Sequence, residues 1–261
     1  VLVTGSRLEL SCDPTSARVS HILQAVMEVE NFPLPHLFGL AVLGSGEFHF
    51  VAPQTKLHKV APPGWKERHP TKDGLMQDNF TLHLRIMYYL RFSNVHKLDV
   101  LTRRLIYLQL RHDLLEGRLP LPRHSLLNIA ALALQAEFGD NSNQEAGYFL
   151  LEHYLSESVI RGSSVSQLMQ ELQELHRANE GMHYSQAAIS LIARLQDLPY
   201  YGTHYYHVTQ DKGRQQWWLG ISGSGVLILA GPPSPETLAT AALHPWPSVK
   251  RLSYASHRLT I

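Results

Sequence analysis

The sequence predicts an α+β protein of three consecutive regions, and three patterns carry that prediction. Residues 1–90 combine strand-like alternation with one amphipathic helix, and residues 91–198 keep helical spacing almost throughout. Residues 199–261 return to short strands separated by glycine and proline turns. Because 261 residues suffice for more than one domain, we expect three domains with boundaries near residues 90 and 198.

The opening stretch VLVTGSRLELSC is predicted to form a strand, a tight turn and a second strand. A dinucleotide-binding turn needs further glycines and the start of a helix after Gly5, and neither is present. Leu8, Leu10 and Cys12 alternate with polar residues, which is the period of a half-buried strand. We therefore expect these three side chains to face a core.

The rest of the first region is predicted to contain one helix and three strands. Apolar residues recur on one helical face over residues 16–30. The strands are expected at residues 37–43, 47–51 and 79–90. Together with the opening hairpin, this order of elements is that of a ubiquitin-like roll.

The second region is predicted to be a bundle of four or five helices. Leucines keep helical spacing within residues 96–117, and residues 125–139 are apolar nearly all round, which indicates a helix inside the bundle. Ser164 and Gln167 have the spacing of a capping box at the start of another helix. Residues 185–198 give one more amphipathic helix.

The third region is predicted to be an antiparallel meander. Its strands are expected at residues 203–209, 215–221, 225–230 and within 249–261. Trp217 and Trp218 are adjacent on a strand, so their side chains face opposite ways. We expect Trp246 to pack in the core, because large aromatic side chains mostly serve burial.

Composition and charge exclude several classes of protein. The formal net charge is only +1, so an anionic partner would have to be bound by a local patch. One cysteine excludes an intrachain disulfide framework, and no apolar run approaches the length of a membrane span. Aromatic and basic residues do not alternate as in nucleic-acid-binding proteins. We expect a soluble intracellular protein that binds no nucleic acid.

The histidines and the cysteine do not predict a catalytic or metal site. His204 and His207 lie on opposite faces of their expected strand and cannot easily chelate one ion. A tyrosine phosphatase loop has a histidine before its cysteine, whereas Ser11 precedes Cys12 here, and Arg18 falls one residue late. We expect no enzymatic activity, no metal and no cofactor.

The chain resembles the FERM domain family along its whole length. The stretches that carry the resemblance are LFGLAVL with GEFHFV, KLHKVAPPGWK (56–66), YLQLRHDLLEGRLP (107–120), ALALQAEFGD (131–140) and YFLLEHYL (148–155). Among FERM domains, it is most similar to those of large scaffold proteins that also carry KIND and PDZ domains.

The resemblance implies a clover of three lobes. Residues 1–90 would form a ubiquitin-like β-grasp lobe, and residues 91–198 a helical lobe like acyl-CoA-binding protein. Residues 199–261 would form a lobe like a pleckstrin-homology or phosphotyrosine-binding module, which has seven strands and a closing helix. Because the chain stops near the fifth strand that we count, we expect this lobe and its peptide-binding groove to be incomplete.

The most informative polar stretch is KLHKVAPPGWKERHPTK, residues 56–72, which contains five lysines and arginines and one acid. Clustered ammonium and guanidinium groups bind phosphates by charge and by donated hydrogen bonds. Each basic residue near an anionic leaflet contributes about 1 kcal/mol. Trp65 lies among these residues and is predicted to anchor the chain in a membrane.

The resemblance implies that a phosphoinositide headgroup binds in a basic cleft between the first and third lobes. Lys56 and Lys59 fall on the K-x-x-K segment that supplies much of this cleft in lipid-binding members. The candidate phosphate ligands share a positive charge and are Lys56, Lys59, Lys66, Arg68, Lys250, Arg251 and Arg258. The alternative is a solvated loop whose charges only keep the protein soluble.

We therefore expect a non-catalytic FERM module that recruits a scaffold protein to the cytoplasmic face of the plasma membrane, at cell junctions and the cortical cytoskeleton. Its expected partners are a phosphoinositide membrane surface, junctional or cytoskeletal proteins and receptor tails. The alternative is a protein-interaction module for a receptor tail or a small GTPase without appreciable lipid binding. Arg7 is the only basic residue in the RLELSCD stretch that a GTPase would contact.

Overall fold

The chain divides into two compact units, and each is described by itself. The computed structural model describes all residues except 14, 45, 64, 66–79, 94, 142–146, 210–214 and 256–257. One unit comprises Val1–Tyr89 and His96–Gln109, and the other comprises Leu90–Val95 and Leu110–Ile261. The three-domain division at residues 90 and 198 stays a prediction.

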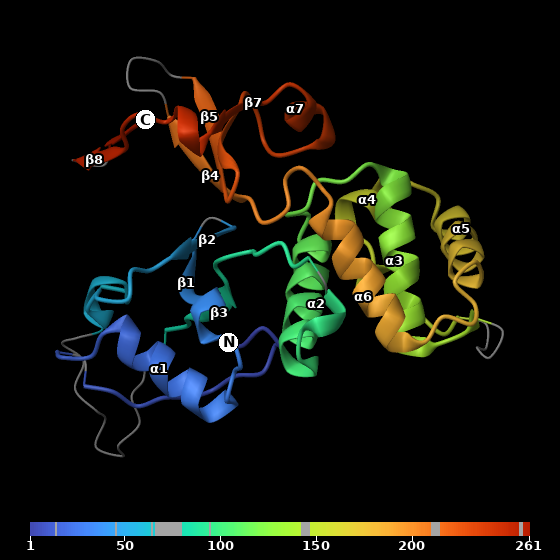
Figure 1. Ribbon diagram of the computed structural model, residues 1–261, viewed down its shortest axis with the longest axis horizontal. Helices are drawn as coiled ribbons and strands as arrows, with labels where there is room; N and C mark the ends of the chain where they lie inside the picture. The colour runs from blue at the N-terminus through green and yellow to red at the C-terminus, as the bar shows by residue number, and fades with distance from the viewer. Residues whose placement is uncertain are drawn as a thin grey trace. The chain divides into compact units, whose positions relative to one another are not determined.

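The first unit contains helix α1 and a three-stranded antiparallel sheet (Figure 1). Helix α1 spans Val19–Glu30, and the strands are β1 (Phe38–Gly44), β2 (Glu47–Phe50) and β3 (His83–Ile86), in the order β2-β1-β3. The predicted helix and these three strands are therefore confirmed. The helix begins later than residue 16 because the carboxylate of Asp13 accepts hydrogen bonds from Thr15 and Ser16 and forms a turn of its own.

The prediction of an opening hairpin is wrong in part. The tight turn is present, with Gly5 at a φ of 84° and the Leu2 amide donating to the Ser6 carbonyl at 2.9 Å. Neither arm is a strand, however, and Leu10 is 41% exposed, whereas Leu2 is buried. The alternation of residues 8–12 needs a neighbouring strand to become a ladder. Among the residues that the structure describes, the opening stretch pairs through Val1 with the segment at Leu82 and Leu84.

The second unit contains a bundle of helices, which confirms the helical second region. The helices are α2 (Val100–Leu115, whose first ten residues belong to the first unit), α3 (Arg123–Phe138), α4 (Glu157–Arg161), α5 (Val165–Arg177) and α6 (Tyr184–Gln196). Figure 1 shows α3 between α5 and α6, and α3 packs against both. Its residues from Ile129 to Gln135 are all buried, as the all-round apolar pattern predicts.

The predicted capping box at α5 is wrong. Ser164 precedes the helix, but its side chain caps no backbone amide and instead lies 3.3 Å from the Ser166 hydroxyl. The Gln167 amide donates to Glu171, one turn further along the helix, at 3.2 Å. A side chain that pairs forward along the helix cannot also reach back to the N-cap.

A buried polar network closes the far end of α3. His176 of α5 has no exposed surface, and its Nε2 lies 2.8 Å from the carbonyl of Gly139. Since a carbonyl only accepts, Nε2 carries the proton and Nδ1 accepts from the Tyr148 hydroxyl at 2.5 Å. Burial lowers the pKa of His176, so the imidazole is held in its neutral form.

The second unit contains the predicted antiparallel meander in part: its first strands pair as expected and gain one further strand, whereas the strands within residues 249–261 form a separate two-stranded sheet. It contains β4 (His204–Thr209), β5 (Gln216–Ser222), β6 (Gly225–Leu229) and β7 (Ala242–Pro245), paired in that order, and β8 (Ser253–Ala255) pairs with β9 (Arg258–Thr260). The sequence interpretation missed β7 and the short helix α7 (Pro235–Ala239). Pro235 opens α7, and Ser234 caps it by accepting from the Thr237 amide at 3.2 Å.

The tryptophans of this sheet do not all lie where the sequence suggests. Trp218 is partly buried and packs against the core of Leu227, Leu229 and Leu238. Trp246 is 37% exposed, so the prediction that it packs in the core is wrong. Its indole N–H donates to the Ser222 carbonyl at 2.9 Å, which holds the ring on the surface beside the β5–β6 turn.

Substitution of Gly225 by alanine is expected to separate β6 from β7. A Cβ at Gly225 would lie 2.3 Å from the His244 carbonyl oxygen, and Gly225 has a φ of 152°. We expect a loss of about 2 kcal/mol of local stability, measured by amide hydrogen exchange of β6 and β7. Gly223→Ala in the same hairpin is the control, because nothing lies within 4 Å of its added Cβ. Equal exchange in both variants would contradict this assignment.

His176 is expected to make the second unit less stable in mild acid. Its folded-state pKa lies below the ordinary value of 6.5, so the unfolded chain takes up the proton first as the pH falls. The contribution to the unfolding free energy is therefore complete above pH 6.5 and declines below it. Urea unfolding at a series of pH values measures this slope.

His176→Gln should flatten that slope, whereas His153→Gln, at an exposed position, should leave it unchanged. An unchanged slope in the His176 variant would show that other groups cause the acid sensitivity.

Candidate functional site

The predicted lysine pair lies on a connection that is fixed to the start of α1. Lys56 pairs with Arg18 in an isolated antiparallel bridge, and the Leu57 amide donates to the Ala17 carbonyl at 3.0 Å. Leu57 begins the 3-10 turn Leu57–Lys59 and is 2% exposed, so it anchors the turn in the core. The backbone at Lys56 and Lys59 is therefore held in place by contacts from distant residues.

The first amides of α1 are already used by this connection. The Val19 amide donates to the Thr55 carbonyl at 3.0 Å, and the Ser20 amide donates to the Pro53 carbonyl at 2.8 Å. The N-terminus of a helix binds phosphate through amides that have no other acceptor. An anion at this place would therefore be held by side chains.

Arg18 adds a third cation that the sequence interpretation did not include. Directly paired residues on antiparallel segments project to the same side, which brings Arg18 and Lys56 together. The Arg18 guanidinium donates to the Gln54 carbonyl at 2.6 Å, and Lys59 is exposed. Residues 48–66 contain no aspartate or glutamate, so this segment brings no carboxylate of its own to neutralise the cations. We call Arg18, Lys56 and Lys59 the basic cluster.

The other predicted phosphate ligands are not brought to this cluster by the described residues. Lys66 and Arg68 lie outside the described residues. Lys250 and Arg251 lie on the exposed connection before β8, and Arg258 is an exposed residue of β9 in the second unit. A single cleft that contains both sets therefore stays a prediction.

The prediction that Trp65 anchors the chain in a membrane is wrong for this structure. The indole is 8% exposed and packs edge to face against Phe80, with 5.2 Å between ring centroids. A buried ring cannot enter a bilayer without leaving this contact. Trp65 is a core residue that packs against Phe80.

The lone cysteine does not resemble an activated nucleophile, and the described residues contain no candidate metal centre. Burial and the neighbouring Asp13 carboxylate raise the pKa of Cys12, whereas a reactive thiolate needs a lowered one. Across the ranges that the structure describes, no group of three or more His, Cys, Asp or Glu side chains could hold a metal ion. In those same ranges, no helix has the length and apolar character to cross a membrane.

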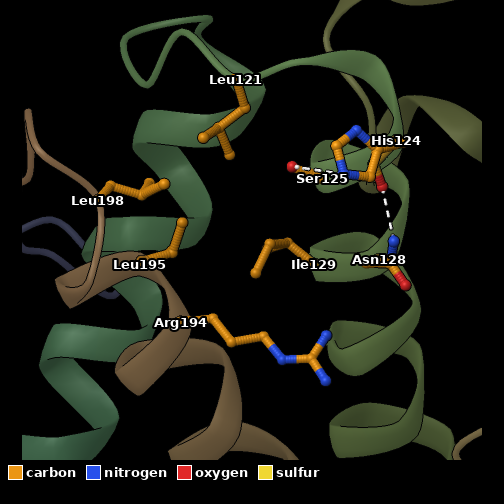
Figure 2. A pocket seen from close by; sticks show the side chains of 8 residues that line it. All are labelled: Leu121, His124, Ser125, Asn128, Ile129, Arg194, Leu195 and Leu198. Atoms are coloured by element: carbon orange, nitrogen blue, oxygen red, sulfur yellow. Dashed lines mark hydrogen bonds between the residues drawn. The ribbon is translucent and has the colours of Figure 1, made fainter.

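A pocket that the sequence interpretation missed lies between the start of α3 and the end of α6 (Figure 2). Its volume is about 290 Å³. The lining residues come from the segment before α3, from α3 and from α6 with the segment after it: Leu121, His124, Ser125, Asn128, Ile129, Arg194, Leu195 and Leu198. No local pattern could have revealed this pocket, because its two sides are far apart in the sequence.

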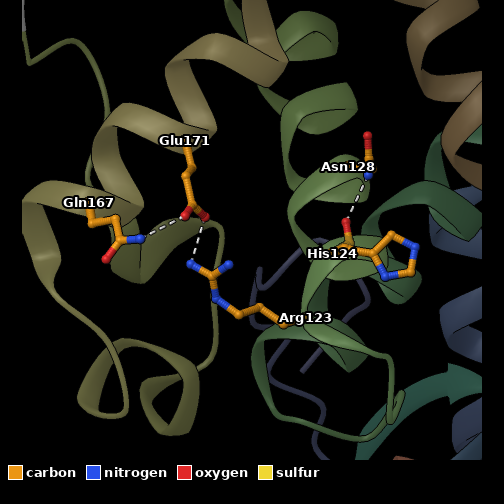
Figure 3. Close-up of polar contacts among 5 residues, drawn as sticks. All are labelled: Arg123, His124, Asn128, Gln167 and Glu171. Atoms are coloured by element: carbon orange, nitrogen blue, oxygen red, sulfur yellow. Dashed lines mark hydrogen bonds and ion pairs between the residues drawn. The ribbon is translucent and has the colours of Figure 1, made fainter.

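An ion pair fixes the start of α3 beside the pocket (Figure 3). Arg123 donates to Glu171 of α5 at 2.6 Å, and Glu171 also accepts from Gln167. The Asn128 amide nitrogen donates to the His124 carbonyl at 2.8 Å, within the first turns of α3. Arg123 is therefore neutralised, and its charge is not directed at the pocket.

Three of the stretches that resemble FERM domains meet in one polar cluster. Arg111 lies 3.3 Å from the Glu137 carboxylate, and its guanidinium stacks over the Tyr154 ring at 4.5 Å. The Tyr154 hydroxyl donates to Glu137 at 2.5 Å, and burial together with that carboxylate raises the pKa of Tyr154. The cluster joins α2, α3 and the 3-10 turn Leu151–His153, so its role is structural.

Several curated relatives match the whole chain, among them one human and one mouse protein. Human tyrosine-protein phosphatase non-receptor type 13 is 35% identical over 264 residues, which cover 100% of this chain and 10% of the relative. Mouse FERM and PDZ domain-containing protein 2 is 34% identical over 266 residues, which cover 100% of this chain and 19% of the relative. The chain thus spans a small part of either protein.

A family model and a solved structure show which part of these relatives the chain corresponds to. The model of the FERM central domain matches residues 93–206. The crystal structure of the FERM and C-terminal domain complex of Drosophila Merlin has a TM-score of 0.67 and 14% sequence identity, and the match covers 96% of this chain and 80% of that one. The predicted resemblance is therefore confirmed: the chain belongs to the FERM domain family, and residues 93–206 are its central domain.

Proposed function

We propose that this FERM module brings a scaffold protein to the cytoplasmic face of the plasma membrane, at cell junctions and the cortical cytoskeleton, by binding a phosphoinositide headgroup. One observation carries the proposal. The bridge brings Arg18 and Lys56 together on a fixed backbone, Lys59 follows in the next turn, and residues 48–66 contribute no carboxylate. Fixed cations lose less conformational entropy on binding a phosphate than cations on a free loop.

The expected strength of this contact is moderate. Each cation close to an anionic leaflet contributes about 1 kcal/mol, so the basic cluster alone would give reversible binding. Lys250, Arg251 and Arg258 remain candidates for further contacts from the second unit. Trp65 has no part in the proposal because it is buried.

FERM domains are also protein-interaction modules, and the Merlin structure contains a FERM domain in complex with a C-terminal domain. We therefore propose junctional or cytoskeletal proteins and receptor tails as partners of this chain. A small GTPase is the alternative partner. It has less support, because Arg7 is exposed but residues 7–12 form no strand to which a GTPase could pair.

Reversal of the lysine charges is expected to abolish most lipid binding. Lys56→Glu with Lys59→Glu should lower the fraction of protein that sediments with phosphoinositide liposomes by about tenfold or more, because two attractive contacts become repulsive. Lys97→Glu with Arg104→Glu makes the same change of net charge at exposed positions of the same unit and should reduce binding far less. Equal losses in the two double variants would show that only net charge matters.

Salt separates the two candidate functions. Lipid binding through exposed cations should fall steeply as the salt concentration rises, because the Debye length shrinks from about 10 Å at 0.1 M to about 3 Å at 1 M. Binding to a receptor-tail peptide or a GTPase that persists in high salt, without any liposome sedimentation in low salt, would favour the alternative.

A further inference from the structure

The pocket between α3 and α6 combines an apolar floor with a polar rim. Leu195 has no exposed surface and Ile129 is 4% exposed, whereas Leu121 and Leu198 are half-buried. Figure 2 shows these four side chains converging on one space from different segments. Such a floor favours an aliphatic group of a ligand, since about 25 cal/mol is gained for each Å² of apolar surface removed from water.

The rim carries positive charge and hydrogen-bonding groups. No aspartate or glutamate lines the pocket, and Arg194 is exposed without an ion pair among the described residues. Figure 2 shows its side chain extending from α6 towards α3, near Asn128. The Asn128 side-chain nitrogen donates a hydrogen bond to the His124 carbonyl. The side-chain oxygen of Asn128 can therefore accept a hydrogen bond from a peptide amide.

Contacts outside the pocket fix both of its walls. The Arg91 guanidinium donates to the carbonyl of Gln196 at 2.5 Å and to that of Leu198 at 2.9 Å, at the end of α6. On the other wall, the ion pair of Arg123 with Glu171 fixes the start of α3, and Arg194 is the arginine that lines the pocket. A pocket that is formed before binding costs little ordering of its own side chains.

We propose that this pocket binds an acidic segment of a partner protein, with one leucine-sized side chain on the apolar floor and an adjacent carboxylate on Arg194. Guanidinium and carboxylate groups form two parallel hydrogen bonds, which fixes the direction of the segment. The volume of about 290 Å³ lies at the lower end of small-ligand pockets, which suits one or two side chains rather than a long acyl chain. The site is separate from the basic cluster and does not depend on lipid binding.

The test uses the full chain and four synthetic probes. The first is the acetylated, amidated peptide Glu-Asp-Leu-Asp-Glu, and the second has lysines in place of its acids. The third has alanine in place of the leucine, and the fourth is decanoate, an aliphatic carboxylate without a peptide backbone. Methyl NMR spectra of Ile129, Leu195 and Leu198 report occupancy during titration to several millimolar.

We expect the acidic leucine peptide to shift these methyl signals with an affinity at least about tenfold higher than either altered peptide. Arg194→Glu should reduce its affinity by about tenfold or more, Arg194→Lys by only a few-fold, and Arg104→Glu, at an exposed position outside the pocket, hardly at all. Lys56→Glu with Lys59→Glu should leave it unchanged, so that loss of lipid binding and loss of this site are told apart.

Three results of the probe titrations would overturn the proposal, and one result of the variants would do the same. The titration results are no methyl shift with the acidic leucine peptide, equal affinity for the lysine peptide, and tight binding of decanoate with none of the peptide. Equal affinity in the Arg194→Glu variant would likewise show that the charge of the rim does not select the ligand.

Discussion

The burial of α3 is the constraint on which the helical part of this FERM chain depends. From Ile129 to Gln135, every residue of this helix is buried, so no face remains to solvate a polar side chain. Its apolar turns remove water from α5 and α6 on either side, which is where most of the stabilisation of a helix in a protein arises. Polar groups can therefore be placed only where the helix ends.

At each end of α3, polar side chains pair with residues that are distant in the sequence. At the far end, the Gln135 amide donates to Asp140 and to the Met182 carbonyl, and Glu137 is shared by Arg111 and Tyr154. At the start, Arg123 forms an ion pair with Glu171 of α5, and residues of the first turns of α3 line the α3–α6 pocket. The same helix thus supplies the stability of the bundle and the wall of its recessed surface, because a rigid element holds side chains in fixed positions.

Periodicity predicted the elements well and their termini poorly. The apolar face of α1 and the all-round apolar α3 were correct because burial dictates those patterns directly. The strand at residues 8–12 failed because alternation cannot say whether a partner strand is available, and Trp65 failed because a ring near lysines can equally well be buried against Phe80. No local sequence pattern distinguishes Arg18 or Arg194 as a candidate site residue. Arg18 is placed by a backbone bridge to Lys56, and Arg194 lines a pocket between two helices that are distant in the sequence.

The pairing of charges decides which cations of this nearly neutral chain can meet a partner. Four arginines each form an ion pair with a carboxylate: Arg111, Arg118, Arg123 and Arg161. Such pairs hold the side chains in place and leave little positive charge to attract another anion. Lys56, Lys59 and Arg194 have no such partner among the described residues, although the backbone that carries them is fixed by Arg18, Leu57 and Arg91. A net charge of +1 therefore conceals two local positive surfaces, for which we propose a phosphate ligand and a carboxylate beside an apolar side chain, respectively. Since the two surfaces lie on different units of the chain, a membrane and a protein segment need not compete for the same cations.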